Sequence, residues 1–200
     1  MKKSLIVLIS ILALLVIIIG YGISINNKMV NADEAVMSQW AKVENQYQRR
    51  ADLIPNLVNT VKGYASHEKE TLDAVVNARA KATQVTISPD NLNEASLQKY
   101  QAAQGELSQA LGRLLMVTEN YPDLKANQNF LQLQEEIADV ENKLAAVRRY
   151  FNSATKEYNN AVQTFPSNII AGMTGFQREI MFDLGKNERA NLEQAPKISF

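Results

Sequence analysis

The chain contains no cysteine, and this absence excludes several kinds of site at once. Disulfides, thiolate metal sites and cysteine nucleophiles are excluded. The protein also cannot be a lipoprotein, because a lipoprotein is acylated on a cysteine. Histidine occurs once, at position 67, so the pair of histidines that a zincin needs is also missing. We expect no metal and no other cofactor, and we interpret His67 as an exposed surface residue.

Other catalytic patterns are missing as well. The sequence has no Gly-x-Ser-x-Gly, no glycine-rich phosphate loop followed by Lys and Ser or Thr, and no Asp-x-Asp-x-Asp-Gly calcium loop. Paired carboxylates such as Glu135-Glu136 lie in a stretch with helical periodicity, where they are typical solubilising charges. We therefore expect that the protein is not an enzyme.

Glycine and proline are also scarce, and neither sign of charge is in excess. The chain has 8 Gly and 5 Pro, and it balances 21 basic against 21 acidic residues. Three of the basic residues, Lys2, Lys3 and Lys28, flank the charge-free run described below. Without them the chain carries 18 basic and 21 acidic residues and a charge near −3. This balance argues against nucleic-acid binding, which usually needs a basic patch, and few Gly and Pro favour long helices.

A charge-free run near the start is the most informative feature that is present. No charged residue occurs between Lys3 and Lys28. The apolar stretch runs from Leu5 through Leu15 to Ile25, which makes a helix about 31 Å long, close to the roughly 30 Å thickness of a bilayer's hydrocarbon core. We expect this stretch to span a membrane.

Residues 1–28 are expected to be an uncleaved signal anchor. A cleaved signal peptide is the alternative, with Gly22 and Ser24 as a weak cleavage site, but its apolar part would be only about 7–15 residues long. Lys2 and Lys3 favour a cytoplasmic N-terminus by the positive-inside tendency. The domain that follows is then expected on the other side of the membrane.

Apolar residues recur every three or four positions in the rest of the chain, as in amphipathic helices. The last stripe runs over residues 133–165 as more than four heptads and ends at Pro166. The middle stripe runs over residues 97–121 and ends at Pro122, and Asp123 is the expected N-cap of the final helix. Both segments are predicted to be long helices.

A first helix is predicted over residues 31–82, with Pro55 expected to kink or divide it. A loop at residues 88–91 precedes the middle helix. The apolar segment 167–176 is predicted to form a short fourth helix that caps the bundle, or alternatively a segment that touches the bilayer surface. Three long helices joined by short turns are expected to pack antiparallel.

The expected fold is therefore all-α, with an N-terminal transmembrane helix followed by an antiparallel bundle of three long helices and a short fourth. We divide the chain into a transmembrane signal anchor at residues 1–28, a helical bundle at 29–182 and an irregular C-terminal tail at 183–200. Trp40 is expected in the core of the bundle.

One polar group interrupts the first stripe. Arg49, Arg50 and Asp52 lie just before Pro55, and Arg50 occupies a position that faces the bundle. A partly buried Arg50–Asp52 pair that sets helix register is one interpretation. The other is that Arg49, Arg50 and Asp52 contact a partner protein or a lipid headgroup.

Several motifs resemble the bacterial LemA family along almost the whole length of the chain. The longest runs from Gln48 to Val58 as QRRADLIPNLV and continues through VKGYA and HE. Further similar positions are Leu114, residues 119–124 (ENYPDL), Asn129-Phe130, Tyr158-Asn159, Phe165-Pro166-Ser167 and Pro196-Lys197-Ile198-Ser199-Phe200. One departure is Asn26-Asn27-Lys28-Met29-Val30, where the family commonly has Tyr-Asn-x-Leu-Val.

The resemblance implies a single transmembrane helix, an antiparallel helical bundle and association with the bacterial envelope, without a defined reaction. Family members have also been predicted with the short N-terminus outside, opposite to the orientation that Lys2 and Lys3 favour. The apolar stripe over residues 133–165 could pack within one chain or between the chains of a homo-oligomer equally well.

We expect a membrane-anchored helical scaffold or interaction protein of the bacterial cell envelope. It would span the inner membrane once, with its bundle on the extracytoplasmic side. Its partners would be the lipid bilayer and a protein, such as a membrane protease or an envelope complex. The alternative is a protein that binds or remodels the membrane surface through residues 169–176.

Overall fold

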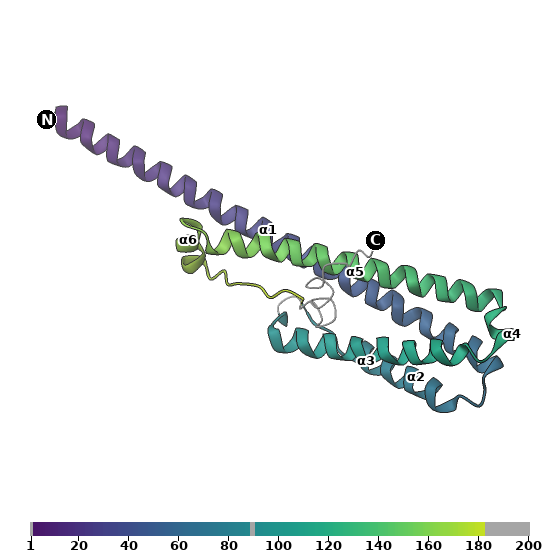
Figure 1. Ribbon diagram of the computed structural model, residues 1–200. Helices are drawn as coiled ribbons and strands as arrows, with labels where there is room; N and C mark the ends of the chain where they lie inside the picture. The colour runs from purple at the N-terminus through teal and green to yellow at the C-terminus, as the bar shows by residue number, and fades with distance from the viewer. Residues whose placement is uncertain (1, 89–90, 183–200) are drawn as a thin grey trace, which may run out of the picture.

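The computed structural model describes residues 2–88 and 91–182, and within them it contains six helices and no strand (Figure 1). The all-α prediction is confirmed. The predicted tail 183–200, including the motif at 196–200, lies outside the described residues. The helices are α1 (Lys2–Tyr64), α2 (Lys69–Gln84), α3 (Glu94–Thr118), α4 (Pro122–Lys125), α5 (Gln128–Gln163) and α6 (Ser167–Thr174).

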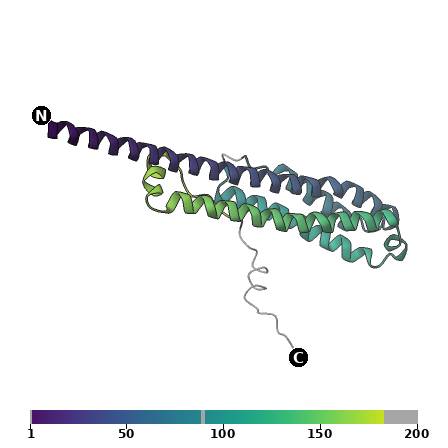
Figure 2. The same ribbon diagram turned by 90° about the horizontal axis from the view of Figure 1, so that it is seen from above.

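Helix α1 contains both the predicted span and the first helix of the bundle. It has 63 residues and is about 95 Å long at roughly 1.5 Å per residue. Its N-terminal part projects from the bundle as a single rod, with exposed side chains up to the half-buried Gly22 (Figures 1 and 2). Ile25 and Met29 are its first buried residues. The predicted boundary between residues 28 and 29 therefore falls inside an unbroken helix.

The predicted helix over residues 31–82 is two antiparallel helices. The chain stays helical at Pro55 and reverses only at residues 65–68, between α1 and α2. A proline removes the N–H that would bond to the carbonyl four residues earlier, here that of Ala51. Arg79 of α2 supplies the missing donor, because its Nε donates to the Ala51 carbonyl at 2.7 Å.

The connection from α3 to α5 also differs from the prediction. Pro122 begins a separate short helix, α4, at the first helical position that suits proline. Helix α5 begins at Gln128, and its N-cap is Asn127, whose side-chain oxygen accepts from the Phe130 N–H at 3.0 Å. The prediction of Asp123 as that N-cap was wrong, because Asp123 lies in the first turn of α4.

Two apolar clusters form the core of the bundle. The first cluster, on the side of the projecting part of α1, surrounds Trp40, which is 1% exposed, with ring centroids of Tyr100 and Phe151 at 5.5 and 5.6 Å. The distal cluster, towards α4, includes Leu57 and Leu107, both fully buried. The predicted stripes supply these residues, and the placement of Trp40 in the core is confirmed.

The chain after α5 returns along the bundle. Helix α6 packs against α1 and α5 through the buried Ala171, and it ends at Gly175, which has a φ of 85° that favours glycine. Residues 176–182, here called the strap, then run back over the helices (Figure 1). The ring of Phe182 stacks on Trp40 with centroids 5.8 Å apart.

Candidate functional site

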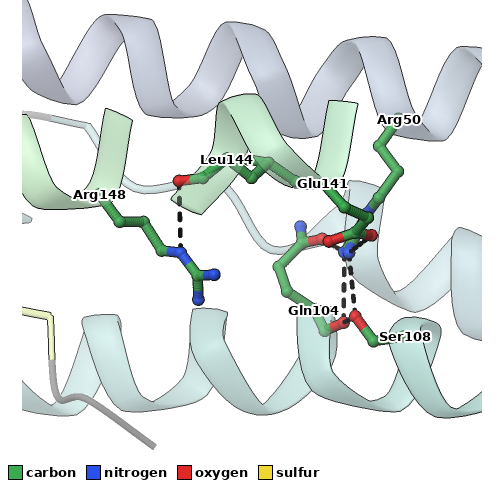
Figure 3. Close-up of polar contacts among 6 residues, drawn as sticks. All are labelled: Arg50, Gln104, Ser108, Glu141, Leu144 and Arg148. Atoms are coloured by element: carbon green, nitrogen blue, oxygen red, sulfur yellow. Dashed lines mark hydrogen bonds and ion pairs between the residues drawn. The ribbon is translucent and has the colours of Figure 1, made fainter. Parts of the chain in front are cut away.

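Arg50 lies at the centre of a polar layer between the two apolar clusters. The side chain is 1% exposed. Its Nη1 donates to Glu141 Oε1 at 2.8 Å and to Ser108 Oγ at 2.9 Å. Its Nη2 donates to Gln104 Oε1 at 2.5 Å and to the Gln104 carbonyl at 3.2 Å (Figure 3). Arg50, Gln104, Ser108 and Glu141 therefore join α1, α3 and α5.

The polar layer also reaches α2, because Gln104 Nε2 donates to the Ala82 carbonyl at 3.3 Å. Tyr47 covers Arg50 from the same helix, with its ring centroid 5.1 Å from the guanidinium carbon. A buried guanidinium is costly unless its donors are paired. Here both terminal nitrogens are paired, which fixes how α1, α3 and α5 align along their lengths.

The predicted pair of Arg50 with Asp52 was wrong. Residues two apart on a helix do not face each other, so Asp52 lies on the outer surface, where it accepts from Gln48 Nε2 at 2.8 Å. Arg49 is exposed as well. A partner contact at Arg49, Arg50 and Asp52 stays a prediction, and Arg49 and Asp52 are its two surface residues.

The strap is held by a pair of asparagine side chains on α5 that sequence reasoning missed. Asn159 accepts from the Glu179 N–H and donates to the Glu179 carbonyl, both at 2.8 Å. Asn152 accepts from the Phe182 N–H at 2.8 Å and donates to the Phe182 carbonyl at 3.2 Å. An amide side chain offers both a donor and an acceptor, so it can pair with extended backbone as a neighbouring strand would. The signal in the sequence is the seven-residue spacing, which places both asparagines on one face of α5.

Carboxylates of the strap and α1 lie close enough to interact electrostatically. Burial raises the pKa of Glu179, and the charge of Asp33 raises it further. The pKa of Asp33 is also raised, by burial first and then by Glu34. Tyr158, whose hydroxyl donates to the Gln177 carbonyl at 2.7 Å, has a pKa raised to about 12, mainly by burial. Docking of the strap therefore brings acidic groups together.

His67 lies exposed in the turn between α1 and α2. Its neighbour Glu68 accepts a hydrogen bond from the Tyr121 hydroxyl at 3.0 Å, which links this turn to the chain before α4. Among residues 2–88 and 91–182, no group of three or more His, Asp or Glu side chains is placed to hold a metal ion. The polar groups of the bundle thus hold helices and turns together.

The projecting end of α1 carries the predicted span. Leu5 and Leu15 are 58% and 48% exposed, whereas Ile25 is 9% exposed and begins the core. Within the described residues, α1 is the one helix long and apolar enough to cross a membrane, judged by its length and composition. The Ser10 hydroxyl is satisfied inside this stretch, because it donates to the Ile6 carbonyl at 3.0 Å.

Comparison with known proteins decides the family. The sequence profile of the LemA family matches residues 39–200, which include the polar layer and the two asparagines that hold the strap. The chain belongs to the LemA family. The match begins inside α1, after the span, so the family assignment rests on the bundle.

Two curated relatives are similar in sequence to this LemA-family chain. It is 23% identical to Protein LemA of Metamycoplasma hominis, over 84% of this chain and 73% of that protein. It is 24% identical to Magnetosome protein MamQ of Magnetospirillum gryphiswaldense, over 76% of this chain and 62% of MamQ. The chain thus spans less than two thirds of the length of MamQ.

Proposed function

We propose that this LemA-family protein is a membrane-anchored helical scaffold of the bacterial cell envelope, without catalytic activity. It would present its bundle to a protein partner beside the inner membrane. The observation that supports this most is the continuity of α1 from the span into the core. A helix without a linker holds the bundle at one height above the bilayer, whereas a flexible tether would let it swing.

The partner is expected to be a membrane protease or an envelope complex that is itself held at the membrane. The two exposed residues of the predicted contact, Arg49 and Asp52, lie 24 and 27 residues beyond Ile25, roughly 36 to 40 Å further along α1. A partner that reaches them must extend to this height, so the length of α1 would select among envelope proteins.

In-cell photo-crosslinking tests the scaffold. A crosslinking residue would replace Arg49 or Asp52 in the full chain, with exposed Asn77 of α2 as the control position. We expect a defined adduct with another membrane protein from position 49 or 52 and a weaker one from 77. Inserting four glycines after Lys28 should reduce the adduct without unfolding the bundle. Recovery of monomer alone from all positions would contradict the proposal, and an adduct with a second copy would indicate a homo-oligomer instead.

The extracytoplasmic side is proposed from Lys2 and Lys3, and protease shaving tests it. Protease added to intact spheroplasts should degrade the bundle. A bundle that resists degradation until the cells are lysed would place it in the cytoplasm.

A second candidate function is binding or remodelling of the membrane surface through residues 169–176. It is favoured by the exposure of Ile169 and Met173, which are 54% and 79% exposed. Flotation of residues 29–200 with liposomes is the test. Failure to bind any lipid mixture would reject this function for the isolated bundle.

A further inference from the structure

Helix α6 lies at the level where the predicted span ends. A side-chain carbon at Gly22 would lie 3.6 Å from Ile170 Cδ1 of α6, so the two helices nearly touch at that residue. Gly22 precedes Ile25, the end of the span, by less than one turn. Figures 1 and 2 show α6 at the end of the bundle from which the N-terminal part of α1 projects. The bilayer surface would therefore meet the molecule at α6.

The side of α6 that turns away from the bundle is apolar. Phe165, just before the helix, is 80% exposed, and Ile169 and Met173 are 54% and 79% exposed. Ile169 and Met173 are four residues apart and share one face of α6. We call Phe165, Ile169 and Met173 the foot. Large apolar side chains that are this exposed on and beside one short helix mark a contact surface.

The segment that carries the foot has no charged residue of its own. No Asp, Glu, Lys or Arg occurs between Glu157 and Arg178. A segment of this composition loses little when it enters the region between headgroups and acyl chains, where amphipathic helices bury their apolar face by about 5–10 Å. An interfacial helix that binds from solution usually carries basic residues, but a segment already tethered by the span does not need electrostatic attraction to arrive.

We propose that the foot inserts into the headgroup–acyl boundary of the same bilayer that α1 spans. This proposal rests on the proposed anchoring by α1. Exposed Tyr21 on α1 lies at the same level and suits the interface, as aromatic residues commonly do. The occupant of the apolar surface is thus lipid, because α6 meets α1 at Gly22, inside the stretch whose exposed side chains would face lipid.

The foot would give the bundle a second point of attachment. A single spanning helix can tilt in any direction, and its tilt is set by neighbouring anchors. Contact of α6 with the interface on one side of α1 defines the direction of tilt, and it fixes which face of the bundle looks along the membrane. The scaffold would then present its partner surface in one orientation as well as at one height.

Site-specific fluorescence in vesicles tests the foot, and the absence of cysteine makes single labels simple. The full chain would carry a polarity-sensitive dye at Met173→Cys. Met116→Cys, 66% exposed near the end of α3, is the matched control, and Leu15→Cys reports the span. Each is reconstituted in phosphatidylethanolamine–phosphatidylglycerol vesicles, with nitroxide lipids as the membrane quencher and iodide as the aqueous quencher. Reconstitution into phosphatidylcholine tests whether lipid charge matters.

We expect a blue shift and quenching by shallow nitroxide lipids at position 173, in both lipid mixtures, and quenching by iodide alone at 116. If iodide quenches the label at 173 as strongly as the label at 116, the insertion of the foot is overturned. Quenching at position 15 by deep nitroxide lipids would in that case still support the anchor. Loss of deep quenching at 15 would instead overturn the anchor. A label at 173 that neither quencher reaches would show that protein covers α6, which also overturns the proposal.

Discussion

Arg50 shows how a single charged residue can set the alignment of a bundle. It replaces an apolar side chain in the stripe of α1, and its partners Gln104 and Glu141 lie on two other helices. A sliding of either helix by one turn, about 5.4 Å, would break these bonds and leave a buried charge unpaired. Apolar contacts alone would tolerate such a shift more easily.

Substitution of Arg50 should therefore be costly. Arg50→Gln is expected to lower the free energy of unfolding by about 2–4 kcal/mol, because Gln104 loses a buried partner while the 41% exposed Glu141 regains some water. Arg49→Gln, on the exposed neighbour, should change it by less than about 0.5 kcal/mol. Urea unfolding of the full chain in detergent micelles measures both, and equal effects would contradict the role of the polar layer.

Pro55 and Arg79 form a second pair of residues that depend on each other. Arg79→Met should destabilise the protein by about 1–2 kcal/mol, since the Ala51 carbonyl loses its donor. In a Pro55→Ala background the helix regains its own N–H, so the same substitution should cost about 1 kcal/mol less. A double-mutant cycle by urea unfolding measures this coupling, and additive effects would show that Arg79 does not compensate for the proline.

At the scale of elements, the strap is held by side chains that copy the pairing of a strand. Asn159→Ala is expected to lose about 1–2 kcal/mol of strap docking, because two hydrogen bonds to Glu179 disappear. Undocking exposes Trp40, the one tryptophan, by removing Phe182 from its ring. A red shift of tryptophan emission reports this, and Asn160→Ala on the exposed side is the control.

Docking of the strap should also depend on pH. Glu179 lies on the strap, and its pKa is raised above 4.5 by burial and by the charge of Asp33, so the docked state binds this proton more tightly than the free state. Docking is therefore strongest below that ordinary value and weakens as the pH rises through the raised one. Tryptophan emission as a function of pH measures this change.

The control for the pH dependence is Glu179→Gln. It should flatten the part of the profile that comes from the strap, whereas Glu44, whose pKa burial also raises near Trp40, titrates in both proteins. Identical profiles in the two proteins would show that Glu179 does not control docking.

At the scale of the whole molecule, α1 is expected to act as one rigid rod that crosses the proposed membrane surface. Spin labels at Ile19→Cys and Asn45→Cys, both exposed, are 26 residues apart and should lie about 39 Å from each other. Electron–electron double resonance in vesicles should give one narrow distance distribution. Four glycines inserted after Lys28 should broaden it, and a distribution already broad without them would contradict the rigid connection.

The sequence predicted the helical stripes well but not the way in which they meet. Leu72 and Val75 continue the period of the first stripe, so nothing in the pattern separates α2 from α1, although both residues are buried across a chain reversal. Asp52 was the nearest acid to Arg50 in the sequence, whereas the true partner, Glu141, is 91 positions away. The prediction of a short helix after Pro166 held, and its place beside Gly22 was not foreseeable from period alone.

Local physics explains this division. The spacing of apolar residues, the length of the uncharged run and the absence of cysteine can be read from the sequence directly. The sequence by itself therefore determined which segments are helical, the candidate span and the lack of familiar catalytic motifs. The partner of Arg50, the donor for the Ala51 carbonyl and the position of α6 beside the end of the span depend on groups far apart in the chain. Only tertiary packing decided them, because side-chain periodicity shows which face of a helix is buried and not what covers it.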